Sequence, residues 1–287
     1  MSLLIDDSER PVEFVLHPTD LSEASTRAFH HALAIAVRLG SRFTLLHAVA
    51  HRDPSSHQAF PTIRGTLAAW EAAGSLDDRA ERVTPRTEKV EVKERDPVAA
   101  VRKYIDRHPV DMLVAATEGR TGLARLLRPS TAQRMARETK LPTLFVPAEG
   151  RSFVDGATGA VTLRRILLPM DPHTDARPAM IRAVRSASLL DDPDLEVVLL
   201  HVSDGDPPRA GDAPQLPYCR WTVMQRPGEV VPQILAAAEE LEVDAIYLST
   251  TWSKGGFGKS GGDVTESVIA GASCPVMAVP ALGASQA

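Results

Sequence analysis

Short, mainly apolar runs alternate with helix-like patterns along this chain. In the first half, the runs FVLHP, TLLHAV, MLVAAT and TLFVP predict buried β-strands. The helices predicted between them are residues 22–40 with Ser22 and Gly40 as caps, 96–108 with Asp96 and Pro97 at the start, and 129–140 with Pro129 in the first turn. Buried strands separated by helices are typical of a parallel sheet covered on both faces. Ligands bind such sheets at the carboxyl ends of the strands, where the strand order reverses.

The whole pattern occurs twice, which predicts two copies of one domain. An apolar run, a proline and an aspartate precede a polar helix start in each half, so that Asp20 and Asp171 are equivalent. The other matched segments are 42–49 with 195–202, 110–117 with 243–250, and 141–147 with 274–280. We therefore expect a first domain over 10–148 and a second over 164–281. The polar segment 149–161 between them has no period and is expected to be a linker.

The two copies differ after their second strand. In the first copy, residues 61–83 have a helical pattern. The second copy is shorter here, and its residues 203–219 are rich in proline and glycine, which predicts a loop. We therefore expect the second copy to have lost one covering helix.

Composition narrows the class of protein. The 287 residues include 44% hydrophobic and 24% charged residues, and the net charge of −5 argues against a general nucleic-acid binder. No apolar stretch approaches the ~20 residues needed to span a membrane, and the N-terminus lacks a signal pattern. The two cysteines, Cys219 and Cys274, form no CxxC motif and predict neither a disulfide framework nor a zinc site. The expectation is a cytoplasmic protein.

The segments PTDLSE, LLHAV and DMLVAATEGRTGLARLLRPSTAQRMARETKLPTLFVP resemble the universal stress protein domain. ILLPMD, VVLLHV, VDAIYLST and CPVMAVP extend the resemblance, more loosely, to the second copy. The resemblance implies that each copy is a Rossmann-like (adenine nucleotide alpha hydrolase-like) domain with a five-stranded parallel sheet and flanking helices. In two-domain members the halves pair through their last strands, here 142–147 and 275–280, as an intramolecular pseudo-dimer. Homodimerisation through another face stays open.

Some members of this family bind ATP through a G-x-x-G-x9-G-[ST] motif after the fourth strand and an aspartate after the first. In the first copy only Gly119 of the three glycines survives, because Ala116 and Pro129 replace the others, while Ser130 keeps its hydroxyl. Glycine lets backbone N–H groups approach a phosphate closely, and proline has no N–H to offer. The resemblance places candidate ligand contacts at Pro18, Thr19, Asp20, Val49, Ala115, Ala116, Gly119, Pro129, Ser130 and Thr131.

The second copy departs further from the motif. The corresponding positions are Ser249, Trp252, Gly262 and Asp263. Trp252 puts a large side chain where backbone would approach a ligand, and Asp263 puts a negative charge where phosphate would lie. We therefore expect no ATP binding of the family's kind in the second copy.

Three other features invite chemical hypotheses. Arginines 120, 125, 128, 134 and 137 surround the loop of the first copy and could attract a triphosphate, although a solvated helix face is the favoured explanation. The segment SKGGFGKS (253–260) resembles a phosphate-binding P-loop but has Ser253 in place of the first glycine, which favours a flexible loop. His51, Asp53 and His57 could form a surface metal site, but we expect none.

Asp20 has no base or nucleophile at a partnered spacing, so we expect it to orient a ligand and predict no catalytic residues. The leading hypothesis is a non-catalytic stress-response protein that acts through ligand or protein-partner binding with eroded nucleotide loops. One alternative is an ATP-binding, slowly hydrolysing site in the first copy. The other is a structural scaffold that binds no ligand.

Overall fold

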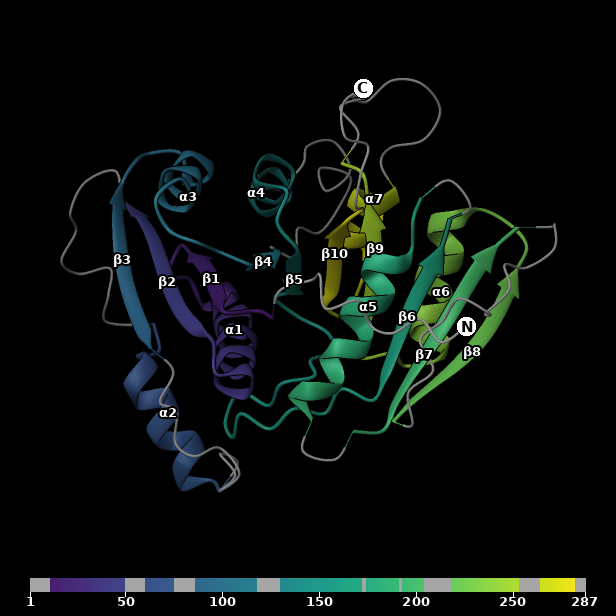
Figure 1. Ribbon diagram of the computed structural model, residues 1–287, viewed down its shortest axis with the longest axis horizontal. Coiled ribbons are helices and arrows are strands. Elements are labelled where there is room, and N and C mark those ends of the chain that lie inside the picture. The colour runs from purple at the N-terminus through teal and green to yellow at the C-terminus, as the bar shows by residue number, and fades with distance from the viewer. Residues whose placement is uncertain are drawn as a thin grey trace. The chain divides into compact units, whose positions relative to one another are not determined.

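The computed structural model describes residues 11–49, 60–74, 86–117, 130–171, 174–190, 193–203, 218–252 and 264–281 (Figure 1). The chain divides into two compact units, the first spanning Arg10–Thr162 and the second containing Leu163–Ala287.

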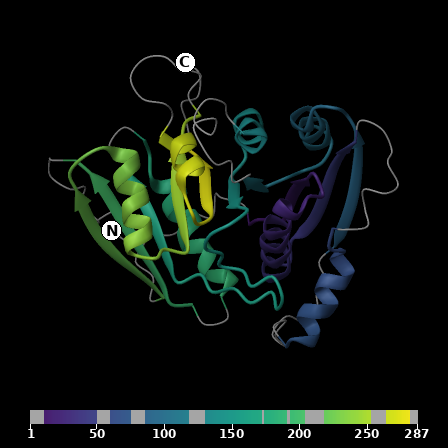
Figure 2. The same ribbon diagram turned by 180° about the vertical axis from the view of Figure 1, so that it is seen from behind.

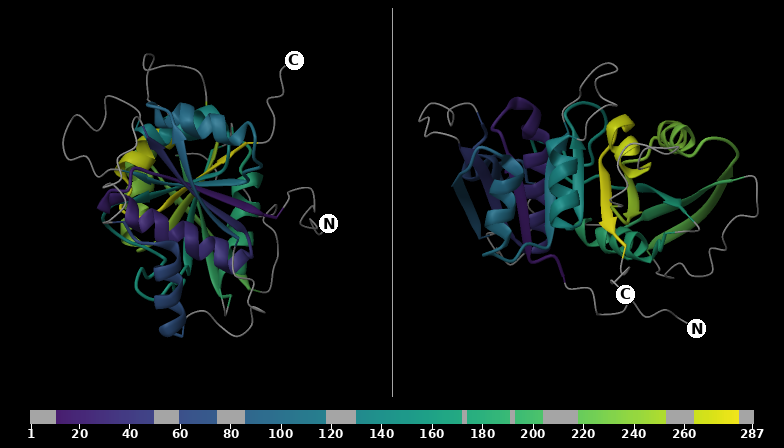
Figure 3. Two further views of the ribbon diagram at one scale, coloured as in Figure 1. Left: turned by 90° about the vertical axis from the view of Figure 1, so that its left-hand side faces the viewer. Right: turned by 90° about the horizontal axis from the view of Figure 1, so that it is seen from above.

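The first unit is a parallel five-stranded sheet with helices on both faces. Its elements are β1 (Phe14–Thr19), α1 (Thr26–Leu39), β2 (Arg42–Val49), α2 (Ile63–Ala72), β3 (Thr87–Lys93), α3 (Pro97–Ile105), β4 (Met112–Thr117), α4 (Thr131–Thr139) and β5 (Thr143–Pro147). The strands run in the order β3-β2-β1-β4-β5, and every neighbouring pair is parallel. Figure 3 shows α1 on one face of this sheet and α3 with α4 on the other. Because both faces are covered, the strands β1, β4 and β5 are almost entirely buried.

The second unit repeats this topology (Figure 2). Its elements are β6 (Arg165–Met170), α5 (Arg177–Arg185), β7 (Leu195–Val202), β8 (Cys219–Arg226), α6 (Val230–Glu240), β9 (Ala245–Thr250), α7 (Val264–Gly271) and β10 (Val276–Pro280). The strands lie in the order β8-β7-β6-β9-β10, again with parallel neighbours only. The predicted fold class and the predicted duplication are thus confirmed.

The structure confirms some of the helix caps that the sequence predicts. Gly40 ends α1 in the left-handed conformation with φ 65°, and the Asp96 side chain accepts a hydrogen bond from the Val98 N–H at the start of α3. The prediction for Ser22 is wrong. Ser22 precedes only a short 3-10 helix over Glu23–Ser25, and its side chain caps nothing because it donates to Asp20.

The segment expected to be a linker packs against the first unit. Phe153 is 1% exposed, and its ring stands edge-on to the His31 ring of α1, with the ring centroids 4.5 Å apart. The indole N–H of Trp70, on α2, donates to the carbonyl oxygen of Gly156 at 3.0 Å. Residues 149–161 therefore complete the hydrophobic packing of the first unit instead of only joining two domains.

The region in which the two copies differ lies partly outside the described residues. Residues 63–72 of the helix predicted over 61–83 form α2, while residues 75–85 lie outside the described residues. Residues 204–217 also lie outside them, so the loss of a helix in the second copy stays a prediction. In the part of the chain that the structure describes, no helix is both long and apolar enough to cross a membrane.

Candidate functional site

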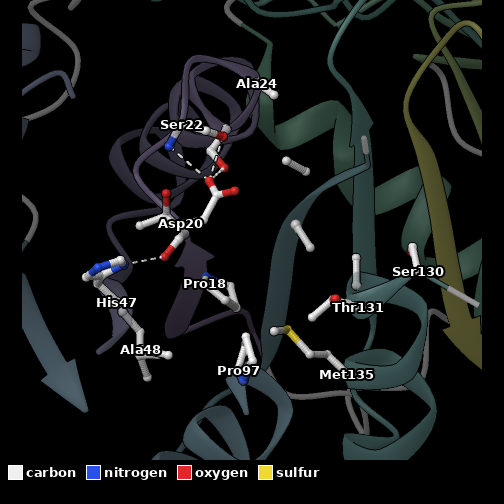
Figure 4. Close-up of a pocket in the computed structure, with 16 residues that line it drawn as sticks. Pro18, Asp20, Ser22, Ala24, His47, Ala48, Pro97, Ser130, Thr131 and Met135 are labelled. Atoms are coloured by element: carbon white, nitrogen blue, oxygen red, sulfur yellow. Dashed lines mark hydrogen bonds between the residues drawn. The ribbon is translucent and has the colours of Figure 1, made fainter. Parts of the chain in front are cut away.

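A pocket of about 240 Å³ opens at the carboxyl ends of β1, β2 and β4 in the first unit (Figure 4). β1 has β2 on one side and β4 on the other, so the pocket lies where the strand order reverses. The start of α4 closes another side. The pocket is lined by Pro18, Thr19, Asp20, Ser22, Ala24, Ser25, Leu46, His47, Ala48, Pro97, Ala115, Ala116, Ser130, Thr131, Ala132 and Met135.

Most residues predicted for the site come together here. The predicted residues that line the pocket are Pro18, Thr19, Asp20, Ala115, Ala116, Ser130 and Thr131. Val49, the last residue of β2, does not line the pocket, and its carbonyl oxygen accepts the Glu94 N–H at 3.2 Å. Gly119 and Pro129 lie outside the described residues.

Asp20 is the one acidic residue among the described residues that line the pocket. Its Oδ1 accepts three hydrogen bonds, from the Ser22 N–H (2.9 Å), the Ser22 hydroxyl (2.6 Å) and the Ser25 hydroxyl (2.7 Å). Burial raises the pKa of Asp20, but these hydrogen bonds outweigh it and hold the pKa below its usual value. The carboxylate is therefore charged at neutral pH, and Figure 4 shows its second oxygen turned toward the pocket.

The turn that carries Asp20 is held on both sides. The Thr19 hydroxyl oxygen accepts the Leu21 N–H at 3.0 Å, and the Thr19 carbonyl accepts a hydrogen bond from His47 Nδ1 at 2.9 Å. Leu21 has a φ of 62°, a left-handed conformation that costs a non-glycine residue free energy. This strained turn positions the Asp20 carboxylate, and the buried side chain of Leu21 anchors the turn.

The start of α4 carries a capping box. The Ser130 hydroxyl oxygen accepts the Gln133 N–H at 3.2 Å, and the Ser130 N–H donates to Gln133 Oε1 at 2.7 Å. Of the arginines considered above, Arg134 pairs with Asp96 at 3.4 Å, with both side chains about half exposed. Arginines 120, 125 and 128 lie outside the described residues.

Several lining residues were missed from the sequence. The pocket is also lined by His47, Ser25, Pro97 and Met135, none of which is among the residues predicted for the site. A signal existed for Ser25, since a hydroxyl five positions after a strand-end aspartate can reach its carboxylate. Nothing along the sequence marks Met135, which reaches the pocket only because α4 packs beside β4.

The corresponding rim of the second unit is different. Asp171 is exposed, and its carboxylate accepts the Thr174 hydroxyl at 2.9 Å. Trp252 is 6% exposed and has a φ of 44°, so a buried indole lies two residues after the end of β9. Residues 253–263, which include the P-loop-like segment, Gly262 and Asp263, lie outside the described residues.

Metal binding and cysteine chemistry find no support in the described residues. No group of three metal-ligating side chains occurs among them, and His51, Asp53 and His57 are not part of this set. Cys219 and Cys274 are both buried and form no disulfide, and burial raises the pKa of the Cys219 thiol to about 11. A thiol of this kind is unreactive at neutral pH.

The sheet order and the pocket at its reversal point define a Rossmann-like α/β protein built as a tandem repeat. Comparison with known proteins gives the family: the chain belongs to the universal stress protein family, whose model matches residues 13–147 and 212–280. The resemblance predicted from the sequence is thereby confirmed.

Relatives agree with this assignment. Universal stress protein MJ0531 of Methanocaldococcus jannaschii is 26% identical over 157 residues, which cover 51% of this chain and 88% of that protein. A universal stress protein from Archaeoglobus fulgidus has a similar fold over 94% of this chain and 97% of its own, with a TM-score of 0.60 and 18% identity. A protein from Pseudomonas aeruginosa described as a universal stress protein gives a TM-score of 0.58 at 15% identity, over 94% of each chain.

Proposed function

We propose that this chain is a non-catalytic, cytoplasmic stress-response protein whose first unit binds an adenine nucleotide or nucleoside and passes the bound state to a protein partner. The observation that carries this proposal is the Asp20 carboxylate. One of its oxygens is held by three hydrogen bonds and the other is turned toward the pocket. A carboxylate that is fixed and charged before a ligand arrives is suited to orient it.

The chemistry of the pocket supports a ring-bearing polar ligand. Pro18, Leu46, Ala48 and Met135 supply apolar surface for a flat ring. Ionised Asp20 can only accept hydrogen bonds, so it requires a ligand with donors such as a ribose diol or an exocyclic amine. Together these features fit the sugar and base of a nucleotide.

The way in which the polar groups of the pocket are used supports a non-catalytic role. General base catalysis needs a base within hydrogen-bond reach of a nucleophile. His47 Nδ1 is bonded to a backbone carbonyl and the Ser130 hydroxyl oxygen is occupied in a helix cap. Both groups therefore support the local structure of the pocket.

Isothermal titration calorimetry on the full chain tests the proposal. ATP, AMP, adenosine and cAMP are suitable probes, the last because one universal stress protein has been crystallised in complex with it. We expect micromolar binding of at least one of them, lost in Asp20→Ala and unchanged in Asp171→Ala, the equivalent change in the second unit. Equal losses in both variants, or no binding to the unmodified chain, would contradict the proposal. Release of inorganic phosphate from ATP above background would show that the site is catalytic.

A further inference from the structure

We propose that β3, the edge strand of the first unit, is a self-association surface, and that two copies of this chain pair there as an antiparallel, twofold-symmetric dimer centred on Val90. The partner is thus a second copy of the same chain. The inference does not depend on the ligand proposed above, because none of the described residues that line the pocket belongs to β3.

The position of β3 in the sheet supplies the backbone groups that such a pairing needs. Among the described strands, β3 has β2 on one side and no strand on the other (Figure 1). The Arg86 carbonyl oxygen accepts the Phe43 N–H at 2.9 Å, and the Glu94 N–H donates to the Val49 carbonyl oxygen at 3.2 Å. Because the bonded residues alternate along a parallel ladder, the even-numbered residues of β3 bond to β2, and the odd-numbered ones direct their N–H and C=O groups to the outer edge.

The sequence of β3, TEKVEVK, is complementary to itself in one antiparallel register. A twofold axis through Val90, the middle residue of the strand, sets Lys89 opposite the second copy's Glu91 and, by symmetry, Glu91 opposite its Lys89. The remaining positions each set one charged side chain opposite a neutral one. Opposite charges on facing residues stabilise a strand pair, and this register contains two such pairs and no like-charge pair.

The neighbouring registers bring like charges together. Two copies share the faces of one continuous sheet only when the axis passes through a residue, so the nearest alternatives are centred on Lys89 and on Glu91. The first sets Lys89 opposite itself, and the second sets Glu91 opposite itself and Lys89 opposite Lys93. Like charges that face each other destabilise a strand pair. The charges that discourage other pairings at this edge therefore select the register centred on Val90.

A groove between β3 and α3 gives the second copy an apolar contact as well. The groove has a volume of about 290 Å³, and Val90, Val92 and Tyr104 are among the residues that line it. Val90 and Val92 pack against the core cluster that contains Tyr104, but both remain half-buried. Because side chains alternate along a strand, the second copy's Val90 and Val92 come to this same face and cover the groove. Apolar burial thus adds to the backbone hydrogen bonds of the pair.

Sedimentation velocity on the full chain gives the first test. We expect a monomer–dimer equilibrium with a dissociation constant on the order of 10 μM, because two paired strands bury less surface than the interface of a tight dimer does. A chain that stays monomeric up to about 200 μM, well above this constant, would overturn the proposal.

Two charge reversals on the exposed face of β3 give the sharper test. Lys89→Glu sets carboxylates opposite each other at two places, and Glu91→Lys does the same with ammonium groups, so each variant alone should dimerise at least about tenfold more weakly. An equimolar mixture of the two variants restores opposite charges at both places. We expect this mixture to form a heterodimer with about the affinity of the unmodified chain. Damage to the fold of either variant cannot produce such a rescue.

Lys93→Glu is the matched control, since it makes the same change of charge in the same strand but lies opposite the neutral Thr87. We expect it to alter the dissociation constant by less than about threefold. Equal weakening by Lys93→Glu and Lys89→Glu would reveal a general effect of net charge and would overturn the assigned register. Dimers that neither reversal weakens, or a mixture of the two variants that stays monomeric, would overturn the assignment of β3 as the surface.

Discussion

His17 is a titratable side chain in the core of the first unit. Its Nδ1 donates to the Val114 carbonyl at 2.7 Å, while its Nε2 has no hydrogen-bond partner among the described residues. Burial lowers the pKa of His17 to about 4. The unfolded chain, with a histidine pKa near 6.5, therefore binds a proton more readily than the folded one. The free energy of unfolding therefore does not depend on His17 above about pH 6.5. As the pH falls from there toward 4, it decreases by about 3 kcal/mol because of this residue.

The second unit supplies the matching substitution for His17. Leu168 occupies the same place in β6 and is fully buried. We expect His17→Leu to make the fall in unfolding free energy between pH 7 and pH 5 shallower, measured by urea unfolding at each pH. The fall should not vanish, because burial also lowers the pKa of His31 to about 4. A pH dependence identical to that of the unmodified chain would show that His17 is not the titrating group.

Substitutions of Asp96 test how much the cap of one helix, α3, contributes to stability. Its Oδ1 caps α3 through the Val98 N–H at 3.2 Å, and its Oδ2 accepts from Arg134 at 3.4 Å. Loss of a helix cap costs about 1 kcal/mol, whereas an ion pair between half-exposed side chains contributes between about 0 and 1 kcal/mol. We expect Asp96→Ala to lower the urea midpoint and Asp96→Asn, which keeps a capping oxygen, to change it little. Equal losses in the two variants would assign the stabilisation to the ion pair.

The predictability of an element depends on how deeply it is buried. The apolar runs of β1, β2, β4 and β5 predict these strands clearly, because helices cover both faces of the sheet that they form. No apolar run marks β3, whose sequence TEKVEVK is mostly exposed, with only Val90 and Val92 half-buried. It is an edge strand of the first unit's sheet, where charged side chains discourage unwanted pairing. Its existence follows from the number of strands that the resemblance implies, and its position from the structure alone.

The site shows the same division between local and tertiary information. Asp20 and Ser130 follow from the sequence, because each stands at the junction of a strand or loop with a helix. His47 and Met135 enter the pocket through the order of the strands and the packing of α4, which no periodicity specifies. Gln133 could have been noticed three residues after Ser130, since this spacing is that of a capping box.

For the molecule as a whole, the boundary of the first unit is the feature least evident from the sequence. A polar, glycine-containing segment over 149–161 predicts a linker, but one buried phenylalanine is enough to change its role. Gly159 supports the packing, because its φ is 76° and a Cβ there would lie 2.4 Å from the Trp70 ring. Compositional reasoning averages over the segment and so overlooks a single anchoring contact.

The packing of this segment predicts how two shortened chains will behave. We expect residues 10–162 to fold cooperatively, and residues 10–148 to be less stable by several kcal/mol. The shorter chain exposes the Phe153 site and leaves the Trp70 indole N–H without its acceptor, and burial of one phenylalanine alone contributes about 1.5–3 kcal/mol. Trp70 is the only tryptophan in either fragment, so its fluorescence reports directly on this contact. Unfolding midpoints that coincide, with the same emission maximum in both fragments, would mean that residues 149–161 act as a linker after all.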